Sequence, residues 1–275
     1  MNVSQHASEY RERGYTVLRG LFRAEECDAL LADVHRNVAR EETTLGASTL
    51  SHGGIVYTGG IYVHSEATRR ALTSPRVLDV LTAIAGPDLW VTMDQAVLKH
   101  PGAGVFRWHQ DNGYNQLKRE HFQLWIALTD TEKANGALML APGSHRRGLL
   151  PHAYRGEGQV EVTAPVGDTV TVDATKGDVI LFSSLMLHAT GPNEAESTRV
   201  AYVAEFMRLR DYAPAATAPF FVAAEGGAPA GRFTDEKPGA RDPRNHLLYL
   251  PQRAEKAARN LLRPLKRRLL GQAPS

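Results

Sequence analysis

Between Leu89 and Met207 the chain is a series of short strand-like segments, and this series limits the fold more than any other feature. Nine runs of four to eleven residues are separated by turn-forming pairs such as Pro101-Gly102 and Asn135-Gly136. Gly, Pro and Asn favour turns because of their backbone conformations. Short strands at this spacing predict a sandwich or a jelly-roll barrel. The predicted strands are Leu89–Lys99, Phe106–Asp111, Phe122–Leu128, Ala137–Leu140, Val160–Thr163, Thr169–Val172, Val179–Phe182, Leu185–His188 and Arg199–Met207.

Helical patterns precede these strands. Apolar residues recur at spacings of three and four from Ala24 to Arg40, which predicts an amphipathic helix. Ser74-Pro75 begins another helix, which ends at Gly86-Pro87. Helices followed by strands predict an α+β class with a mainly β core. The other predicted segments are a helix over Ser4–Arg13, a strand over Gly14–Gly20, a long loop over Glu41–Gly60 and a helix over Ser65–Leu72.

Composition is that of an ordinary globular domain. Hydrophobic residues make up 43% of the 275 positions, charged residues 23%, and the net charge is +2. So small a charge does not indicate a nucleic-acid partner. The single cysteine, Cys27, lies in a helical run, which predicts a buried small side chain in a reducing compartment.

No apolar run approaches the roughly 18 residues of a membrane span, and residues 1–13 lack the apolar core of a signal peptide. We therefore expect a cytoplasmic protein without stable membrane insertion, as a monomer or homodimer.

We expect a single domain over residues 1–250. It comprises N-terminal helices (1–86), a jelly-roll core (87–208) and a covering segment rich in Pro, Ala and Gly (209–250). Asp211–Asp242 shows little periodicity and is predicted to be a long connection over the barrel. Residues 251–275 form a basic amphipathic tail. Such a tail touches an acidic partner or a membrane surface, or is an ordinary packed or solvated terminal helix.

His109 and Asp111 are separated by one residue in a predicted strand, so their side chains should point the same way. A His and a carboxylate together supply two ligands of the 2-His-1-carboxylate triad that binds Fe(II). The pair alone is a weak signal, because about one His-x-Asp/Glu triplet is expected by chance and the chain has two. The other, His64-Ser65-Glu66, opens a helical run, so Glu66 is interpreted as a structural acid of the first turn.

His188 is a candidate for the third ligand. It ends an apolar hairpin just before a Gly-Pro turn, where a histidine either binds a metal or donates to a backbone carbonyl. Arg199 follows eleven residues later and opens a mostly apolar strand. A buried guanidinium needs an anion, and Glu205 is six positions away. A bound carboxylate ligand would satisfy Arg199 through two hydrogen bonds.

Four motifs occur in order along the chain: G-Y-T-V-L-R-G-L-F near the start, L-K-H-P-G-A-G, then His109-Gln110-Asp111 followed by W-I-A-L-T-D-T-E-K-A-N-G-A-L-M-L-A-P-G-S-H, and finally His188 with Arg199. Together they resemble the phytanoyl-CoA dioxygenase family of Fe(II)- and 2-oxoglutarate-dependent oxygenases, over residues 14–207. The resemblance implies a double-stranded β-helix, the cupin-like jelly-roll barrel, with supporting N-terminal helices.

The resemblance also implies functional residues. It implies iron ligands at His109, Asp111 and His188, and a salt bridge from Arg199 to the distal carboxylate of 2-oxoglutarate. The further co-substrate contacts that we expect are the hydroxyl of Thr190, the ring of Trp125 and the amide of Gln95. For Gln95, a purely structural role explains the residue about as well as contact with the co-substrate. No lysine near Gly54 matches one that some relatives use for the co-substrate. In the Pro142-Gly143-Ser144-His145 turn, His145 is expected to bond backbone and not metal.

The family's chemistry consumes dioxygen and 2-oxoglutarate, releases succinate and CO2, and hydroxylates an aliphatic C–H bond. Halogenating relatives lack the carboxylate ligand, so Asp111 favours hydroxylation, or a related desaturation or ring-forming oxidation. The substrate is expected to be a small molecule. The residues that we expect to line the substrate pocket are His52, Tyr57, Tyr62, Arg107, Asn112, Tyr114 and Asn115. For each of them, a solvent-exposed or structural role is the alternative interpretation.

Two other classes of function stay open at this point. One is a cupin-like barrel that binds metal without oxygenase chemistry, as in a sensor or an isomerase. The other is an interaction protein that works through its basic tail. The spacing of Arg199 from His188 argues against the first.

Overall fold

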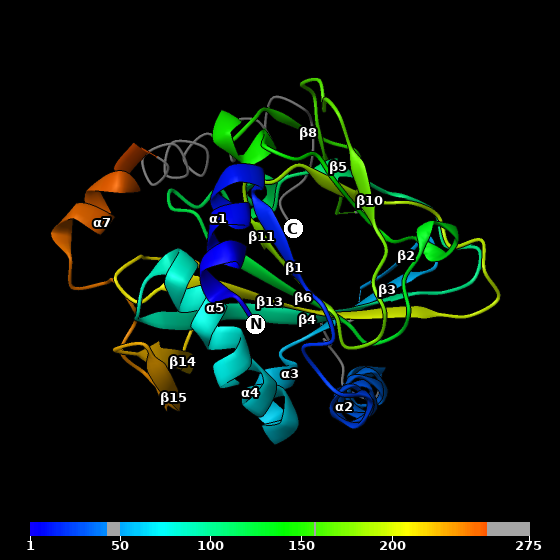
Figure 1. The fold of residues 1–275 in the computed structure, drawn as a ribbon. Helices are drawn as coiled ribbons and strands as arrows, with labels where there is room; N and C mark the ends of the chain where they lie inside the picture. Colours follow the sequence, from blue (N-terminus) through cyan, green and yellow to red (C-terminus); the bar gives the residue numbers. More distant parts are fainter. Residues whose placement is uncertain (43–49, 157, 252–275) are drawn as a thin grey trace, which may run out of the picture.

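The computed structural model describes residues 1–42, 50–156 and 158–251 (Figure 1). The strands are β1 (Tyr15–Leu18), β2 (Leu50–His52), β3 (Ile55–Gly59), β4 (Leu89–Lys99), β5 (Phe106–His109), β6 (Phe122–Ala127), β7 (Leu138–Leu140), β8 (His152–Tyr154), β9 (Val160–Val162), β10 (Val170–Val172), β11 (Val179–Ser183), β12 (His188–Thr190), β13 (Arg199–Arg208), β14 (Phe220–Glu225) and β15 (Ala228–Thr234). The helices are α1 (Val3–Arg13), α2 (Ala24–Glu42), α3 (Ile61–His64), α4 (Glu66–Leu72), α5 (Pro75–Ala85), α6 (Asn112–Asn115) and α7 (Pro243–Leu248).

Two antiparallel sheets form the barrel. The larger has the strand order β1-β11-β6-β13-β4-β14-β15, with β3 also paired to β4 and β2 to β3. The smaller has the order β10-β7-β12-β5, and β8 and β9 form a separate hairpin. Helices α1 to α5 lie on the outer side of the larger sheet, away from the smaller one (Figure 1). This arrangement confirms the predicted jelly-roll class with supporting N-terminal helices.

Side chains that alternate along the strands form two hydrophobic cores, one between the larger sheet and the helices and one inside the barrel. On β6, Phe122, Leu124 and Ile126 pack outward with the helices, whereas Trp125 and Ala127 point into the barrel. Successive strand residues face opposite sides of a sheet, so a strand covered on both faces is buried throughout, as β6 is. Full burial of each large apolar side chain contributes about 1.5–3 kcal/mol. The barrel interior can therefore carry polar groups while the outer face holds the sheet against the helices.

The helices follow the sequence pattern closely. On α2, Cys27, Leu30 and Val34 are buried against the sheet. Burial raises the pKa of the Cys27 thiol to about 11, as expected for a small packed side chain and not a nucleophile. Ser65 caps α4 by accepting from the Thr68 amide, and the prediction of a first-turn acid at position 66 is confirmed.

The Pro142–His145 turn also has the predicted structure. Gly143 adopts a left-handed conformation, with φ of 80°. The Nε2 atom of His145 lies 3.3 Å from the backbone oxygen of Arg11, so this histidine bonds backbone and stands outside the metal cluster.

Two sequence predictions of irregular structure were wrong. Within Asp211–Asp242, β14 and β15 form a hairpin, and β14 pairs with β4 at the edge of the larger sheet. Its Phe220-Phe221-Val222 core is a strand signal that the surrounding Ala, Pro and Gly masked. Within Glu41–Gly60, β3 pairs with β4 over Ile55–Gly59.

The boundaries near the site also differ. The predicted strand Leu185–His188 is largely a turn, and β12 begins at His188.

The basic tail lies almost wholly outside the described residues, since these end at residue 251. No described helix is long and apolar enough to cross a membrane.

Candidate metal centre and co-substrate pocket

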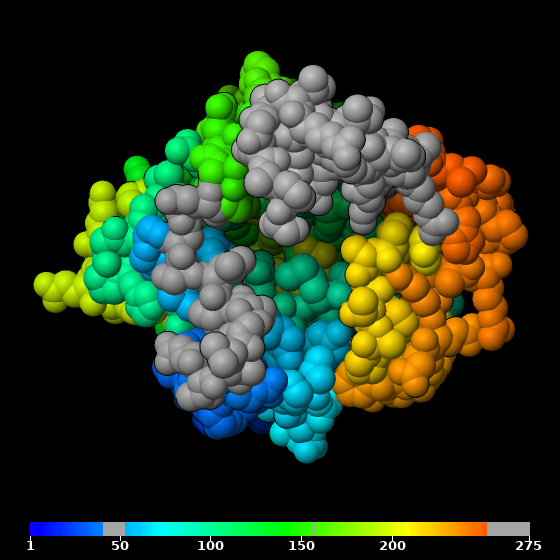
Figure 2. Space-filling model, turned by 180° about the vertical axis from the view of Figure 1, so that it is seen from behind, coloured from blue at the N-terminus to red at the C-terminus, as the bar shows by residue number. Residues whose placement is uncertain are grey.

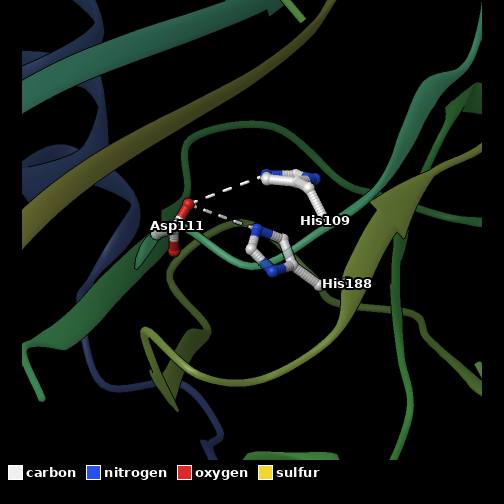
Figure 3. Close-up of side chains that lie close together, drawn as sticks. All are labelled: His109, Asp111 and His188. Atoms are coloured by element: carbon white, nitrogen blue, oxygen red, sulfur yellow. Dashed lines mark ion pairs between the residues drawn. The ribbon is translucent and has the colours of Figure 1, made fainter. Parts of the chain in front are cut away.

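Three potential metal ligands meet inside the barrel (Figure 3). His109 ends β5 and His188 begins β12, and the register of these two strands pairs them directly. The Nε2 atom of each histidine lies 3.6 Å from Oδ1 of Asp111. One ligand atom from each of the three residues lies within 4.8 Å of the others. The arrangement is a compact N,N,O donor set.

Asp111 reaches this position from a turn and not from a strand. The predicted strand continued to Asp111, but β5 ends at His109 and Asp111 has helical angles at the start of α6. The expected reason for convergence, a shared strand face, was therefore wrong. The chain bends at residue 110 and carries the carboxylate back toward both imidazoles.

The protonation of the site suits a metal. The Nδ1 atoms of His109 and His188 donate to the carbonyl oxygens of Arg107 and Met186, at 2.7 and 3.0 Å, which leaves both Nε2 atoms free to ligate. Burial, together with the charge of His109, lowers the pKa of His188 to about 4, so its ring is neutral near pH 7.

Asp111 is held ionised. Burial raises the pKa of Asp111, but His188 and His109 outweigh that effect and the net direction is downward. Its Oδ2 atom is buried and has no hydrogen-bond partner among the described residues. Two imidazoles with free Nε2 atoms and an ionised carboxylate with an unpaired oxygen are the donor set of the Fe(II) facial triad, so the residues present fit that metal.

Gln110, between two of these ligands, fixes the bend. It is fully buried, and its amide nitrogen donates to the carbonyl oxygens of Gly148 and Leu185 at 2.8 and 2.7 Å. Its amide oxygen accepts from the Leu150 backbone at 2.8 Å, and its own backbone amide donates to His152. Sequence reasoning missed this role; the available signal was a neutral polar residue between two ligands.

The same interior contains two buried cations. Arg199 opens β13 directly opposite Lys99, the last residue of β4. Their exposures are 2% and 0%. The Arg199 Nη2 atom donates to the Gly136 carbonyl at 3.0 Å, and Lys99 Nζ donates to Thr190 Oγ1 at 2.9 Å. Within the described parts of the chain neither cation pairs with a carboxylate, and the Nε atom of Arg199 has no partner.

Burial of Lys99 and Arg199 disfavours their charged forms. It lowers the pKa of Lys99 to about 7, with the charge of Arg199 adding to the effect, and that of Arg199 to about 10. Two buried like charges with no acidic partner among the described residues favour the binding of an anion. The ring of Trp125 lies 5.9 Å from the Arg199 guanidinium carbon, and the charge of Arg199 also acts on Tyr57.

Lys99 was not predicted from the sequence. No lysine stands near Gly54 in the sequence, but the structure places Lys99 opposite Ile55, the residue after Gly54, across the β3–β4 pair. The lysine therefore enters the pocket from the neighbouring strand. Its signal was a charged residue at the end of an apolar strand, in the L-K-H-P-G-A-G motif.

The other predicted site residues are distributed more widely. Gln95 is half-buried opposite Val203, on the face that carries Lys99 but nearer the middle of β4. Asn112 is buried, and its Oδ1 atom has no partner in the described chain. Tyr114 meets the His109 ring edge-on, at 5.4 Å between centroids.

Three predicted substrate contacts, Arg107, Tyr62 and Asn115, lie away from this interior. Arg107 is partly exposed and pairs with Glu161 at 3.6 Å. Tyr62 packs in the outer core with Phe221, so its prediction as a substrate contact was wrong. Asn115 is exposed and accepts from the Leu117 backbone. The side chain of His52 is outside the described residues.

Residues 10–201 match the model of the phytanoyl-CoA dioxygenase (PhyH) family. The chain belongs to this family. It is 25% identical over 224 residues to the peroxisomal phytanoyl-CoA dioxygenase of Bos taurus, with 72% of this chain and 66% of that protein covered, just under two thirds of its length. It is 26% identical over 221 residues to the ectoine dioxygenase of Bordetella parapertussis, with 69% and 70% covered.

Solved structures of the same fold agree. The non-haem monooxygenase ThoJ superposes with a TM-score of 0.69 at 24% identity, over 92% of this chain and 96% of ThoJ. The epimerase SnoN superposes with a TM-score of 0.64 at 23% identity, over 84% and 97%. The predictions of family and fold are confirmed. So is the predicted class of enzyme, an Fe(II)- and 2-oxoglutarate-dependent dioxygenase.

Proposed function

We propose that the protein hydroxylates an unactivated C–H bond of a small molecule, with iron held by His109, Asp111 and His188 and with release of succinate and CO2. The observation that carries this proposal is the convergence of two imidazoles and a carboxylate on one point of the barrel interior. When bound, Fe(II) supplies the redox chemistry that couples decarboxylation of 2-oxoglutarate to oxidation of the substrate.

The distal carboxylate of 2-oxoglutarate is assigned to Arg199 and Lys99. Both are buried cations without an acidic partner in the described chain, and a carboxylate between them would relieve their repulsion. Thr190 already orients the lysine, and Trp125 supplies an apolar wall beside the guanidinium. Gln95 is assigned a place along the co-substrate because it shares the face of Lys99 on β4.

The ligand set favours hydroxylation over halogenation. Asp111 supplies a carboxylate where a halogenase needs an open position for halide. Tyr57, Asn112 and Tyr114 are assigned to the substrate side, because Asn112 and Tyr114 follow Asp111 directly and Tyr57 packs on Phe106, which contacts His109. The partly exposed Arg107 is assigned to the entrance.

The proposal extends to the domain organisation, compartment and oligomeric state of the protein. We assign one oxygenase domain to residues 1–250 and a separate tail to 251–275, in a cytoplasmic monomer or homodimer that does not bind nucleic acid. The low net charge of +2 supports the last point.

Anaerobic titration with Fe(II) and 2-oxoglutarate tests the assignment through the visible charge-transfer band of the chelate. We expect a band in the wild type and its loss, or a much weaker co-substrate affinity, in Arg199→Ala. Arg70→Ala is the matched control, because Arg70 is an exposed arginine paired with Glu66 on α4. The absence of a band in the wild type would overturn the proposal and favour a metal-binding barrel without oxygenase chemistry.

A further inference from the structure

A small surface cavity lies beside the strand that carries His109. Its volume is about 240 Å³, and three distant segments of the chain line it. They include Gly53 in the β2–β3 turn, Arg107 on β5, and Arg155 and Gln159 in the β8–β9 turn. In Figure 2 these segments, coloured light blue, blue-green and green, come together on one face beside a hollow with a blue-green floor. We call this space the arginine cavity.

The charged side chains that line the arginine cavity have one sign. They are Arg107 and Arg155, and no acid occurs among the described residues of the lining. Another cavity, of about 480 Å³ between α1 and β10, differs in this respect, because its two arginines are balanced by Glu9 and Asp173. The arginine cavity therefore favours an anion on the charge of its walls alone.

One carboxylate serves both arginines. Arg155 Nε donates to Glu161 Oε2 at 2.7 Å, and Arg107 Nη1 lies 3.6 Å from Oε1 of the same residue. A guanidinium has five N–H donors, so Arg155 uses one of them, and 3.6 Å is too long for a hydrogen bond from Arg107. Two positive charges and one negative charge leave a net charge of +1. The surplus donors and the surplus charge match a second carboxylate, or a phosphate, bound bidentately.

The cavity is open to a ligand. The side chains of Arg107 and Arg155 are 47% and 46% exposed, and a Cβ added at Gly53 would meet nothing within 4 Å. Gln159 is 7% exposed, and its Oε1 atom has no hydrogen-bond partner in the described part of the chain. The oxygen and nitrogen of a side-chain amide are nearly the same size, so Gln159 can turn its N–H donors toward an anion.

Strand β5 and Tyr114 connect the arginine cavity to the metal centre. Arg107 precedes His109 by two residues, about 7 Å along an extended strand, and its carbonyl oxygen accepts from His109 Nδ1. The Tyr114 ring meets the His109 ring edge-on, and its hydroxyl accepts from the Val160 amide at 3.3 Å. Val160 begins β9, the strand that carries Glu161. A ligand anchored by the arginines thus lies within a few bond lengths of the metal ligands.

We propose that Arg107 and Arg155 bind an anionic group of the primary substrate, a carboxylate or a phosphate, at the edge of the metal centre. The inference rests on the proposed function and names its substrate class: a small acid whose oxidised C–H bond lies several bonds from the anionic group. Glu161 orients both guanidinium groups and repels the bound anion. A cationic substrate is rejected, because the cavity has a net positive charge.

Four probes of equal chain length test this class: hexanoate, hexyl phosphate, 1-hexanol and hexylamine. They are titrated by calorimetry into the anaerobic protein saturated with Fe(II) and 2-oxoglutarate, which occupies Arg199 and Lys99. We expect at least one anion to bind tenfold more tightly than hexanol, and hexylamine to bind no better than hexanol. The tighter anion identifies the head group of the substrate. Anions that bind no better than hexanol, or hexylamine that binds as well as they do, overturn the inference.

Three substitutions in the arginine cavity test its residues. Arg107→Gln and Arg155→Gln should each weaken anion binding about fivefold, a modest change because both side chains are half exposed. Glu161→Gln should strengthen it, because the variant removes the negative charge beside the arginines. Arg23→Gln is the matched control, since Arg23 is a surface arginine that also shares a glutamate, Glu26, with a second arginine. An affinity that is unchanged in any of the three variants, weaker in Glu161→Gln, or equally weakened in the control overturns the inference.

Arg199→Ala, titrated without metal, separates the arginine cavity from the co-substrate pocket. This variant should keep the affinity for the tighter anion, because Arg107 and Arg155 are intact. Loss of binding in Arg199→Ala, with binding retained in Arg107→Gln, would place the anion in the co-substrate pocket and overturn the inference. A wild type without a charge-transfer band refutes the proposed function itself, whereas a band without anion preference refutes only the arginine cavity as a substrate site.

Discussion

Replacement of Lys99 by methionine tests the anion pocket most directly, because the side chain keeps most of its length and its apolar stem but loses its charge and its N–H donors. Lys99 is fully buried opposite Arg199. A hydrogen bond from a buried charged group contributes about 1.5–3 kcal/mol, and each 1.4 kcal/mol changes Kd tenfold. Lys99→Met should therefore weaken 2-oxoglutarate binding by about 10- to 150-fold in the anaerobic titration.

The same change should stabilise the ligand-free protein. Burial lowers the pKa of Lys99 from 10.5 to about 7. A cation with a depressed pKa in the folded state destabilises that state as pH falls from 10.5 to 7, and the cost is constant below 7. This interval corresponds to at most about 5 kcal/mol. The free energy of unfolding should consequently rise in Lys99→Met at pH 6 and change much less at pH 10.

Chemical denaturation at these two pH values, with and without 2-oxoglutarate, measures both effects. Lys176→Met is the matched control, since Lys176 is a surface lysine paired with Asp28. The control should leave the affinity for 2-oxoglutarate unchanged. A Lys99→Met variant that binds 2-oxoglutarate within threefold of wild type, or that is less stable at pH 6, would refute the assignment of Lys99 as an anion ligand and leave it a structural residue.

The remaining predictions concern pH and the metal centre. In the wild type, the affinity for 2-oxoglutarate should be constant below pH 7 and should fall above it, by up to tenfold per pH unit, as Lys99 loses its proton; titrations across pH 6–9 should show this slope and lose it in Lys99→Met. Asp111→Ala should abolish both the charge-transfer band and succinate release while circular dichroism shows a retained fold; unchanged turnover would contradict the triad. Gln110→Ala should weaken Co(II) binding by about 10- to 100-fold, and unchanged affinity in a metal titration would show that the bend holds without it.

Much of the fold was predictable because its signals are local. The alternation of residues in β4 and β13 and the turn pairs between strands are properties of short windows, and those strands lie almost where predicted. The β14–β15 hairpin was missed for the opposite reason. Its second strand, β15, contains Pro229 and Gly231. Its first strand, β14, is stabilised by pairing with β4, more than a hundred residues earlier in the chain.

The site residues also differ in whether a local pattern in the sequence reveals them. His109, Asp111, His188 and Arg199 belong to motifs with fixed spacing, so they were predicted together. Lys99 was not, because nothing within its own strand reveals that Arg199 lies opposite it. Strand pairing across a hundred residues creates that contact, and a sequence without its register does not contain it.

Register also explains why the pocket needs a ligand. Glu205 stands on the same face of β13 as Arg199, and sequence reasoning treated it only as an acid too distant to neutralise the arginine. Three alternations separate the two, and Ala201 and Val203 fill the intervening positions with apolar side chains. With a carboxylate at either of those positions, the cations could pair within the protein and would not require a bound anion. The apolar spacer instead keeps Glu205 away from Arg199 and Lys99, where Thr92 and His121 contact it. The two cations therefore have no carboxylate partner among the described residues, which favours binding of the co-substrate's carboxylate between them.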